Sequence, residues 1–426
     1  MNALIDDLSW RGLIAQSTDR EALSQELDEG PMTLYVGFDP TAPSLHLGNL
    51  LQILTMRRFQ LHGHRPLALV GGATGLIGDP KMAGERTLNP VDVVEGWAAR
   101  LRAELERFYD FDGPAAARMV NNYDWTKDVD VLTFLRDIGK HFSVNRMLDR
   151  EAVAARLANE GISYTEFSYQ LLQSFDYLEL FRRYGCRLQT GGSDQWGNIT
   201  AGVDLIRRVE GAHVHALTTP LVTKADGTKF GKTETGTVWL DANMTSPYAF
   251  FQFWLNADDR DVPTYLRLYS LRSHAEIEAL DEATRTDPAK RAAQRALAQE
   301  LTTLVHGSQA TAAVEAAAQA LFGQGDLAAV PPDTLEAALR EVPHATLDPA
   351  EITGGLLPDI VDLLTRTGLS ASRGAARRTI GEGGAYVNNV RVEDEAFRPP
   401  ASDLIDGRFL VLRRGRKTVA GVLLEG

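Results

Sequence analysis

The sequence predicts a mixed α/β protein in three parts: a parallel-sheet domain, an all-helical domain and a small α+β module. Three observations support this prediction. Strand-like and helix-like segments alternate from residue 33 to about 222, which favours a parallel sheet covered on both faces. Glycine-poor helical patterns follow from about Ser246 to Glu341. The residues after about 357 mix short helical patterns with strand-like pieces such as RFLVLRRG.

Short apolar segments give the expected strands, at Thr33–Phe38, Pro66–Val70, Arg118–Asn121 and Arg187–Thr190. Longer stretches between them have helical periodicity, at Leu45–Leu61, Pro90–Phe108 and Val129–Met147. Several strands end in glycine-rich turns, GFDPTAPS, GGATGLIGDP and TGGSDQWG. Ligands of open parallel sheets bind at the carboxyl ends of the strands, so we expect the site along this edge.

Composition sets limits on the class of protein. The chain has 426 residues, 44% of them hydrophobic and 24% charged, as in ordinary globular proteins. No run of about 18 apolar residues occurs, so no membrane span is expected. The start MNALIDDLSW lacks a basic segment followed by an apolar run, which predicts no secretory signal. Cys186 is the lone cysteine and cannot form an internal disulfide, which suits a cytoplasmic protein. We expect it to be a buried apolar residue.

The net charge of −13 argues, taken alone, against nucleic acid as a partner. Basic residues nevertheless outnumber acidic ones between Arg366 and Lys417. A basic tail on an acidic chain permits a local RNA-binding surface. A solvated surface of mixed charge accounts for the tail equally well on charge alone.

The first constellation is the word YVGFDPTAPSLHLGN. It reads as a strand, a turn rigidified by proline, and a helix that starts near Ser44, a plausible N-cap. Thr41, His46 and Asn49 would gather near that start, and Gly48 would let a flat ring approach the backbone. Helix N-termini bind anions such as phosphate. The alternative is a capped helix with a structural histidine.

The second constellation is KFGKT, Lys229 to Thr233, which follows the strand-like TPLVTKADG. Lysines on a loop can reach a polyphosphate and neutralise charge that develops on a leaving group. A solvated basic loop is the commoner explanation for any two lysines.

The third constellation is a polar stripe on one expected helix, formed at i, i+4 and i+7 by Tyr169, Gln173 and Asp176. Further polar residues from other segments would join it, namely Tyr35, Gln189, Asp194 and Gln195. Together these carboxylates and amides could hold a small ligand that carries both charges.

The order of these pieces resembles that in the bacterial tyrosyl-tRNA synthetase family of class I aminoacyl-tRNA synthetases. HLGN, His46 to Asn49, resembles the HIGH signature of that class, and KFGKT resembles its KMSKS signature. Longer words that resemble the family are GGATGLIGDP, NNYDW, LRDIGKHFSVNRM and GGSDQWGNITAG. SRGAARRTIGEGGAYVNN resembles the S-four RNA-binding fold. The resemblance covers essentially the whole chain.

This resemblance implies activation of L-tyrosine with ATP and transfer of the tyrosine to the 3′ end of its tRNA. It implies a homodimer, Mg²⁺ that accompanies the nucleotide, and no metal bound by the protein itself. The implied domains are a Rossmann-like catalytic domain at 1–225 with a dimer-forming insertion at about 124–160, the lysine loop with a helical anticodon-binding domain at 226–340, a linker at 341–357, and an S-four-like RNA-binding domain at 358–426.

The resemblance also implies roles for single residues. Tyr35 and Asp176 would hold the phenol hydroxyl of tyrosine, and the rest of its pocket would be Asp79, Tyr169, Gln173 and Gln195. The implied ATP-binding residues are Asp39, Thr41, His46, Gly48, Asn49, Asp194 and Lys232. The implied catalytic residues, which act on the triphosphate, are Thr41, His46, Lys229, Lys232 and Thr233.

Two departures from the family pattern stand out. Asn49 occupies the place where the signature often has a second histidine. The loop KMAGER leaves open whether Lys81 or Arg86 binds phosphate. Two alternative functions also remain at this stage: a related class I synthetase with another substrate, and a non-catalytic RNA-binding relative that kept the fold.

Overall fold

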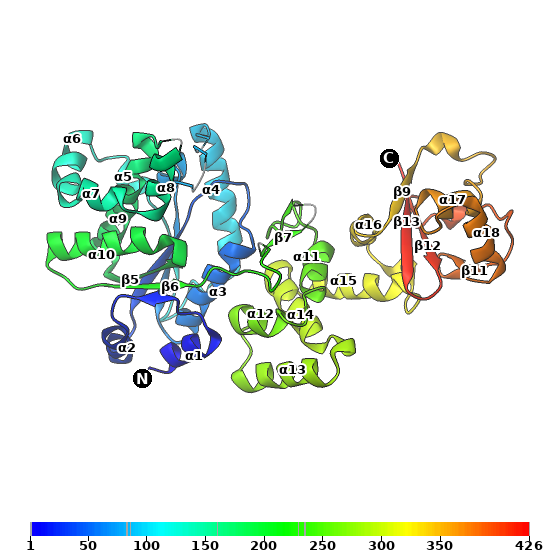
Figure 1. The fold of residues 1–426 in the computed structure, drawn as a ribbon, viewed down its shortest axis with the longest axis horizontal. Helices are drawn as coiled ribbons and strands as arrows, with labels where there is room; N and C mark the ends of the chain where they lie inside the picture. Colours follow the sequence, from blue (N-terminus) through cyan, green and yellow to red (C-terminus); the bar gives the residue numbers. More distant parts are fainter. Residues whose placement is uncertain are drawn as a thin grey trace. The chain divides into compact units, whose positions relative to one another are not determined.

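The computed structural model describes residues 2–81, 84–85, 87–159, 161–228, 230–233 and 236–425 (Figure 1). The chain divides into two compact units. The first unit comprises Met1–Asp241 and Asp258–Ala293, and the second comprises Ala242–Ala257 and Gln294–Gly426. No described helix is both long enough and apolar enough to cross a membrane.

The first unit contains a six-stranded sheet with the order β1-β6-β5-β2-β3-β4. Its strands are β1 (Gln16–Ser17), β2 (Thr33–Phe38), β3 (Arg65–Val70), β4 (Arg118–Asn121), β5 (Cys186–Gly192) and β6 (His215–Thr219). All neighbours pair in parallel except β1 with β6. The four strands predicted from sequence are therefore present, and β1 and β6 were missed. The segment TPLVTKADG, expected to be strand-like, is mainly loop and turn after Thr219, where β6 ends. Cys186 is buried in β5, as expected.

The strand order changes direction between β2 and β5. The chain runs from β2 through β3 to β4 in one direction along the sheet, and from β5 to β6 in the other. Right-handed crossovers then put the connecting helices on opposite faces. The switch in direction opens the sheet at the carboxyl ends of β2 and β5, the usual ligand site of such folds.

Helices cover the sheet of the first unit. They are α1 (Ala3–Arg11), α2 (Arg20–Glu29), α3 (Leu47–Leu61), α4 (Val91–Leu105), α5 (Tyr123–Thr126), α8 (Glu151–Asn159), α9 (Tyr164–Tyr184), α10 (Trp196–Glu210), α12 (Val262–Tyr269) and α13 (His274–Thr286). Helix α3 packs on β2, β3 and β5, whereas α9 and α10 pack on β5 and on each other. The polar stripe at 169, 173 and 176 lies on α9, as predicted.

The single helix predicted over Val129–Met147 was wrong. The segment is broken into α6 (Val131–Thr133), a π-helical turn at Phe134–Ile138, a 3₁₀ turn at Gly139–His141 and α7 (Val144–Leu148). Gly139 is a poor helix former, and the backbone at Phe142 is extended with φ −99° and ψ 127°. Apolar periodicity alone did not reveal these breaks.

The second unit combines helices with a five-stranded sheet of order β11-β10-β12-β13-β9. The helices are α11 (Pro247–Leu255), α14 (Ala292–His306), α15 (Ser308–Leu321), α16 (Pro332–Arg340), α17 (Ile360–Arg366) and α18 (Arg373–Gly381). The strands are β9 (His344–Leu347), β10 (Ala385–Val387), β11 (Val390–Val392), β12 (Phe409–Arg414) and β13 (Thr418–Leu424). The C-terminal part is thus an α+β module, as predicted.

Two boundaries differ from those expected. Residues 341–357, expected to be a linker, contribute β9, which pairs in parallel with β13. Leu347 and Leu357 are fully buried in the core of the C-terminal module, so this stretch folds with it. Residues 258–293, assigned from sequence to the helical domain, group instead with the large sheet.

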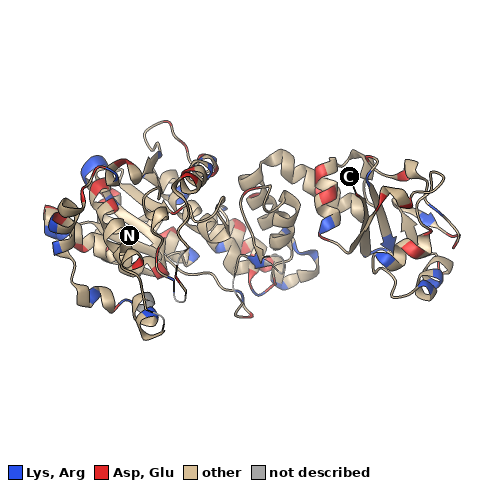
Figure 2. Ribbon diagram, turned by 90° about the horizontal axis from the view of Figure 1, so that it is seen from above, with Lys and Arg blue, Asp and Glu red and all other residues tan. Residues whose placement is uncertain are grey.

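Part of the basic tail is ion-paired. Figure 2 shows acidic and basic residues interspersed along the ribbon, and Arg366, Arg373 and Arg408 pair with acidic residues at 2.6–3.2 Å. Arg413 is only 8% exposed. Among the described tail residues, the exposed cations that form no ion pair are Arg378, Arg414, Arg416 and Lys417.

Candidate active site

Tyr35 of β2 and Asp176 of α9 lie close to each other beside β5. Tyr35 is paired in register with Gln189 of β5. It is 1% exposed, and burial together with the nearby Asp176 carboxylate raises the pKa of Tyr35 well above its usual value. The Tyr35 hydroxyl and the side-chain oxygens of Gln173 and Gln189 are buried without a protein hydrogen-bond partner among the described residues. Unpaired buried polar groups are costly, and Tyr35 and Gln189 lie on neighbouring strands, so these groups indicate a ligand site.

Asp176 is held by two side chains that sequence reasoning missed. Its carboxylate accepts from Asn122 Nδ2 at 2.9 Å and from Trp125 Nε1 at 2.9 Å. Burial raises the pKa of Asp176 to about 7, although these two hydrogen bonds oppose the rise. Both donors come from NNYDW, directly after β4. Their position directly after a buried strand is the sequence signal that could have identified them.

A chain of hydrogen bonds connects Tyr169 with this carboxylate. The Tyr169 hydroxyl donates to Asp39 Oδ2 at 2.6 Å. Thr74 Oγ1 donates to Asp39 Oδ1 at 2.6 Å and accepts from Asn122 Nδ2 at 2.8 Å. Asp39, assigned from the resemblance to ATP, thus contacts a residue of the tyrosine set. The half-buried Asp39 and the buried Asp176 give this part of the site a negative field.

Asp79 is the centre of a second polar group. It accepts from Gln195 Nε2 at 2.8 Å and from Asn198 Nδ2 at 3.2 Å. Gln195 also donates to Asp194 at 3.2 Å, so this amide links the Asp79 and Asp194 carboxylates. Burial lowers the pKa of Arg150, and the nearby Asp79 carboxylate opposes this. Asn198 and Arg150 were not predicted; Asn198 follows Asp194 by four residues, one turn of helix.

His46, and not Ser44, caps helix α3. Its Nδ1 accepts from the backbone N–H of Gly48 at 3.1 Å and of Asn49 at 3.4 Å. Asn49 Oδ1 accepts from the His46 N–H at 3.1 Å, which completes a capping box. The helix starts late because Leu45 is still extended and accepts from Leu240 N at 2.8 Å. Gly48 is required because a Cβ there would lie 2.9 Å from the His46 ring.

The cap fixes the protonation of His46. With Nδ1 accepting, the remaining proton is on Nε2. Partial burial lowers the pKa of His46, and Lys232 nearby lowers it further, although a hydrogen bond to its own backbone opposes them. His46 is therefore a neutral N–H donor at pH 7, placed beside a cation. Thr41 is exposed near this point, and its backbone N–H donates to Asp39 O at 2.8 Å.

The lysine loop comprises residues 224–233, and its described residues 230–233 lie near the start of α3. Lys232 and Thr233 form the short strand β7, which pairs with β8 (Gly236–Thr237). Val238 N donates to Gly231 O at 3.0 Å, and Leu47 N donates to Val238 O at 3.2 Å. Lys229 and Arg86 lie outside the described residues, as does the side chain of Thr233. Their predicted roles are not addressed by the geometry.

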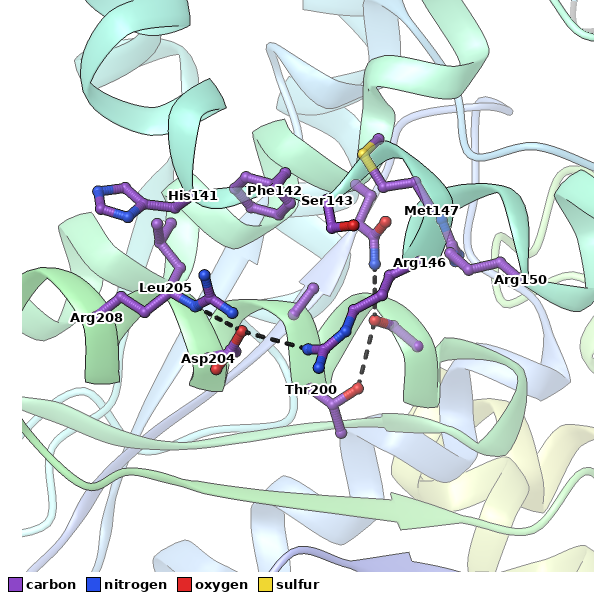
Figure 3. Close-up of a pocket in the computed structure, with 13 residues that line it drawn as sticks. His141, Phe142, Ser143, Arg146, Met147, Arg150, Thr200, Asp204, Leu205 and Arg208 are labelled. Atoms are coloured by element: carbon purple, nitrogen blue, oxygen red, sulfur yellow. Dashed lines mark hydrogen bonds and ion pairs between the residues drawn. The ribbon is translucent and has the colours of Figure 1, made fainter.

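A hollow of about 430 Å³ opens beside Arg150 (Figure 3). His141, Phe142 and Arg146 of the broken segment line one side, and Thr200, Asp204 and Arg208 of α10 line the other. Arg208 donates to Asp204 at 2.8 Å, and Arg146 approaches it at 3.9 Å. The three arginines give the hollow a positive lining. No cluster of three or more His, Cys, Asp or Glu able to hold a metal occurs among the described residues.

Comparisons with known proteins show which family the chain resembles. Residues 27–323 match the family described as tRNA synthetases class I (W and Y), and residues 334–421 match the tyrosine–tRNA ligase SYY-like C-terminal domain. A tyrosine–tRNA ligase of Streptomyces avermitilis is 62% identical over 100% of both chains. Another from Mycobacterium tuberculosis is 60% identical over 98% of both chains.

A solved structure is also similar. The C-terminally truncated mitochondrial tyrosyl-tRNA synthetase of Coccidioides posadasii is 31% identical, with a TM-score of 0.66. The match covers 74% of this chain and 91% of that one. The fold class and the resemblance predicted from sequence are thereby confirmed. The chain belongs to the tyrosine–tRNA ligases within the class I tRNA synthetases.

Proposed function

We propose that this chain activates L-tyrosine with ATP to form tyrosyl adenylate and pyrophosphate, and then transfers tyrosine to the 3′ end of its tRNA. The chain is 61–62% identical over its full length to tyrosine–tRNA ligases. This favours tyrosine over another amino acid as the substrate, and an enzyme over a non-catalytic relative. The observation that carries it is the buried hydroxyl of Tyr35, which has no partner among the described residues and lies beside the Asp176 carboxylate. A cytoplasmic location fits protein biosynthesis and a chain with a single buried cysteine.

Tyr35 and Asp176 would hold the phenol hydroxyl of the substrate. The carboxylate already accepts two hydrogen bonds, and the incoming hydroxyl would donate a third and accept from Tyr35. Phenylalanine would leave both groups unpaired. This effect is already established for the tyrosyl-tRNA synthetase family itself, in which the discrimination against phenylalanine is roughly 10⁵.

The opposite end of the amino acid would meet the second polar group. Tyr169, Gln173 and Asp79 would bind its ammonium, since the Asp39 and Asp79 carboxylates both lie near Tyr169 and the Gln173 amide oxygen is buried without a partner among the described residues. Gln195 would lie near its carboxylate and the ribose, with Asp194 beside the ribose. This keeps the substrate carboxylate free to attack.

The triphosphate would lie between the start of α3 and the lysine loop. The tyrosine carboxylate attacks the α-phosphorus, and pyrophosphate leaves with the bonding electrons. Neutral His46 would donate from Nε2 to the γ-phosphate with Thr41, while Lys232, Lys229 and Thr233 would neutralise charge on the leaving group. Gly48 and Asn49 would leave room for adenosine. These groups are donors and cations, so Mg²⁺ would be held by the nucleotide phosphates, where it adds further charge neutralisation.

Transfer to tRNA would use two basic surfaces. The hollow beside Arg150 carries Arg146 and Arg208 and lies next to the Asp79 group, so it suits the 3′ end of the tRNA. The unpaired tail cations Arg378, Arg414, Arg416 and Lys417 suit phosphates elsewhere on the same RNA. Ion pairs at Arg366, Arg373 and Arg408 and the burial of Arg413 leave fewer cations for RNA than the sequence count suggested.

A homodimer would cover the broken segment after β4. Its apolar side chains are exposed to an unusual degree: Val131 68%, Leu132 75%, Leu135 46%, Val144 58% and Leu148 37%. Contiguous exposed apolar residues mark interaction sites. A two-fold contact through residues 131–148 is the commonest way to cover such a surface.

ATP–pyrophosphate exchange with each of the twenty amino acids tests the assignment. Exchange should depend on tyrosine and be at background with phenylalanine. Stimulation by tryptophan or another amino acid, with none by tyrosine, would contradict the proposed pocket.

A further inference from the structure

Helix α12 presents one face to the lysine loop. Its N-cap Asp261 is followed by Tyr265 and Tyr269 at spacings of four residues, so the three side chains lie on one stripe. All three are buried, at 8%, 3% and 0% exposure. This helix was assigned from sequence to the anticodon-binding domain. None of the roles proposed above for tyrosine activation involves it.

The first half of the loop is a closed turn fixed to the N-terminus of α12. Thr228 donates to Asp226 Oδ1 through its backbone N–H at 2.8 Å and its hydroxyl at 2.6 Å. Lys224 N donates to Thr228 O at 3.1 Å, which closes the turn. Asp261 Oδ1 accepts from Ala225 N at 2.8 Å and ties the turn to the helix.

The second half of the loop is held by two aromatic rings. Phe230 packs against Tyr265 with ring centroids 5.0 Å apart and stacks on Tyr269 at 5.4 Å. The Tyr269 hydroxyl donates to Leu47 O at 3.4 Å, one residue after His46. Gly231 follows with φ +75°, and a Cβ there would lie 3.5 Å from Leu47 Cβ. The rings therefore place Lys232 against the start of α3.

We propose that Asp261, Tyr265 and Tyr269 form a cradle that sets the position of the lysine loop, so that Lys232 meets the same phosphates as His46. This inference rests on the proposed function, which gives Lys232 its role. The three are positioning residues, because they contact the loop and not the substrate. The cradle holds the loop at both ends, through Ala225 in its first half and Phe230 in its second.

The test uses Phe230→Leu, which keeps apolar bulk and removes the ring. A misplacement of about 1 Å can cost roughly 10²-fold in rate, so tyrosyl adenylate formation should slow by about 10- to 100-fold. The KM for tyrosine should not change, because the pocket at Tyr35 is untouched. Phe230→Tyr should restore the rate. Phe322→Leu, at a ring 41% exposed in the second unit, is the matched control and should have the normal rate.

Two further variants distinguish a failure of the cradle from a failure of the proposed function. Asp261→Ala removes the Ala225 contact and should speed tryptic cleavage at the loop several-fold without lowering the melting temperature by more than a few degrees. Lys232→Ala, measured alongside, reports on the proposed function. If Lys232→Ala were as active as the parent protein, the role of the loop would be wrong. If Lys232→Ala were slow while Phe230→Leu and Asp261→Ala matched the parent in rate and in cleavage, the cradle alone would be overturned.

Discussion

The two ends of the candidate site are built differently. At the amino-acid end, Tyr35 and Asp176 are each 1% exposed, and their neighbours are joined in a continuous hydrogen-bonded chain. At the triphosphate end, Lys232 is exposed, and its loop is held by a few contacts. Buried, fixed polar groups suit discrimination, because any mismatch leaves them unpaired. Exposed cations suit a charge that develops only during the reaction.

The comparison predicts that the largest loss comes from the buried end. Asp176→Ala removes the acceptor of the substrate phenol and leaves Asn122 and Trp125 without their partner. We expect kcat/KM for tyrosine to fall by at least roughly 10³-fold, in line with the cost of unpaired groups in such pockets. Exchange kinetics with tyrosine and phenylalanine measure both the loss and the discrimination. Near-normal activity with intact discrimination would show that the pocket lies elsewhere.

A smaller loss is expected at the triphosphate end. His46→Asn keeps a good N-cap residue for α3 but removes the Nε2–H donor. Adenylate formation should slow by about 10²–10³-fold, as for other transition-state donors, with KM for tyrosine unchanged. His46→Ala should slow it equally and cost about 1 kcal/mol more in stability through the lost cap. If His46→Asn were nearly as fast as the parent protein, His46 would act only as the N-cap of α3.

Sequence patterns predicted the fold better than they predicted the contacts within the site. Apolar runs predicted four strands because burial on both faces requires them, but β6 was missed where HALTT mixes apolar and polar residues that are all buried. The position of Asn122 and Trp125 after β4 marked them as candidates, but their contact with Asp176 depends on the pairing of β4 and the packing of α9, which the local pattern does not contain. His46 as N-cap depends on Leu45 remaining paired with Leu240, a contact far away in sequence.

The same limit applies to domain boundaries. A helical pattern shows that α12 is a helix, but not which unit it packs against. Asp261 and Tyr265 contact the lysine loop, which groups this helix with the sheet. Likewise, the proline and glycine of residues 341–357 suggested a linker, whereas His344–Leu347 pairs with the last strand of the chain. Contacts between residues far apart in the sequence determine both boundaries, and local sequence patterns do not contain them.

The smallest predicted effect is a pH dependence of the free energy of unfolding. It arises from Asp176, at the amino-acid end of the site. The pKa of Asp176 is about 7 in the folded chain and close to 3.8 when unfolded. Between these values the folded state binds more protons, so this group lowers stability as pH rises from about 4 to 7. Each pKa unit is worth about 1.36 kcal/mol, so between pH 5 and 7 the loss is at most about 2.7 kcal/mol.

Asp176→Asn isolates that contribution, because the amide cannot ionise. We expect its urea-unfolding free energy to fall less than that of the parent protein between pH 5 and pH 7, and the two curves to run parallel above about pH 8. Tyrosine should narrow the difference in the parent protein, since its phenol hydroxyl donates to the ionised carboxylate and stabilises the charged form. Parallel curves from pH 5 upward would mean that Asp176 is ionised throughout. Its buried charge would then be fully compensated by Asn122 and Trp125, and the contrast between the two ends of the site would rest on hydrogen bonding alone.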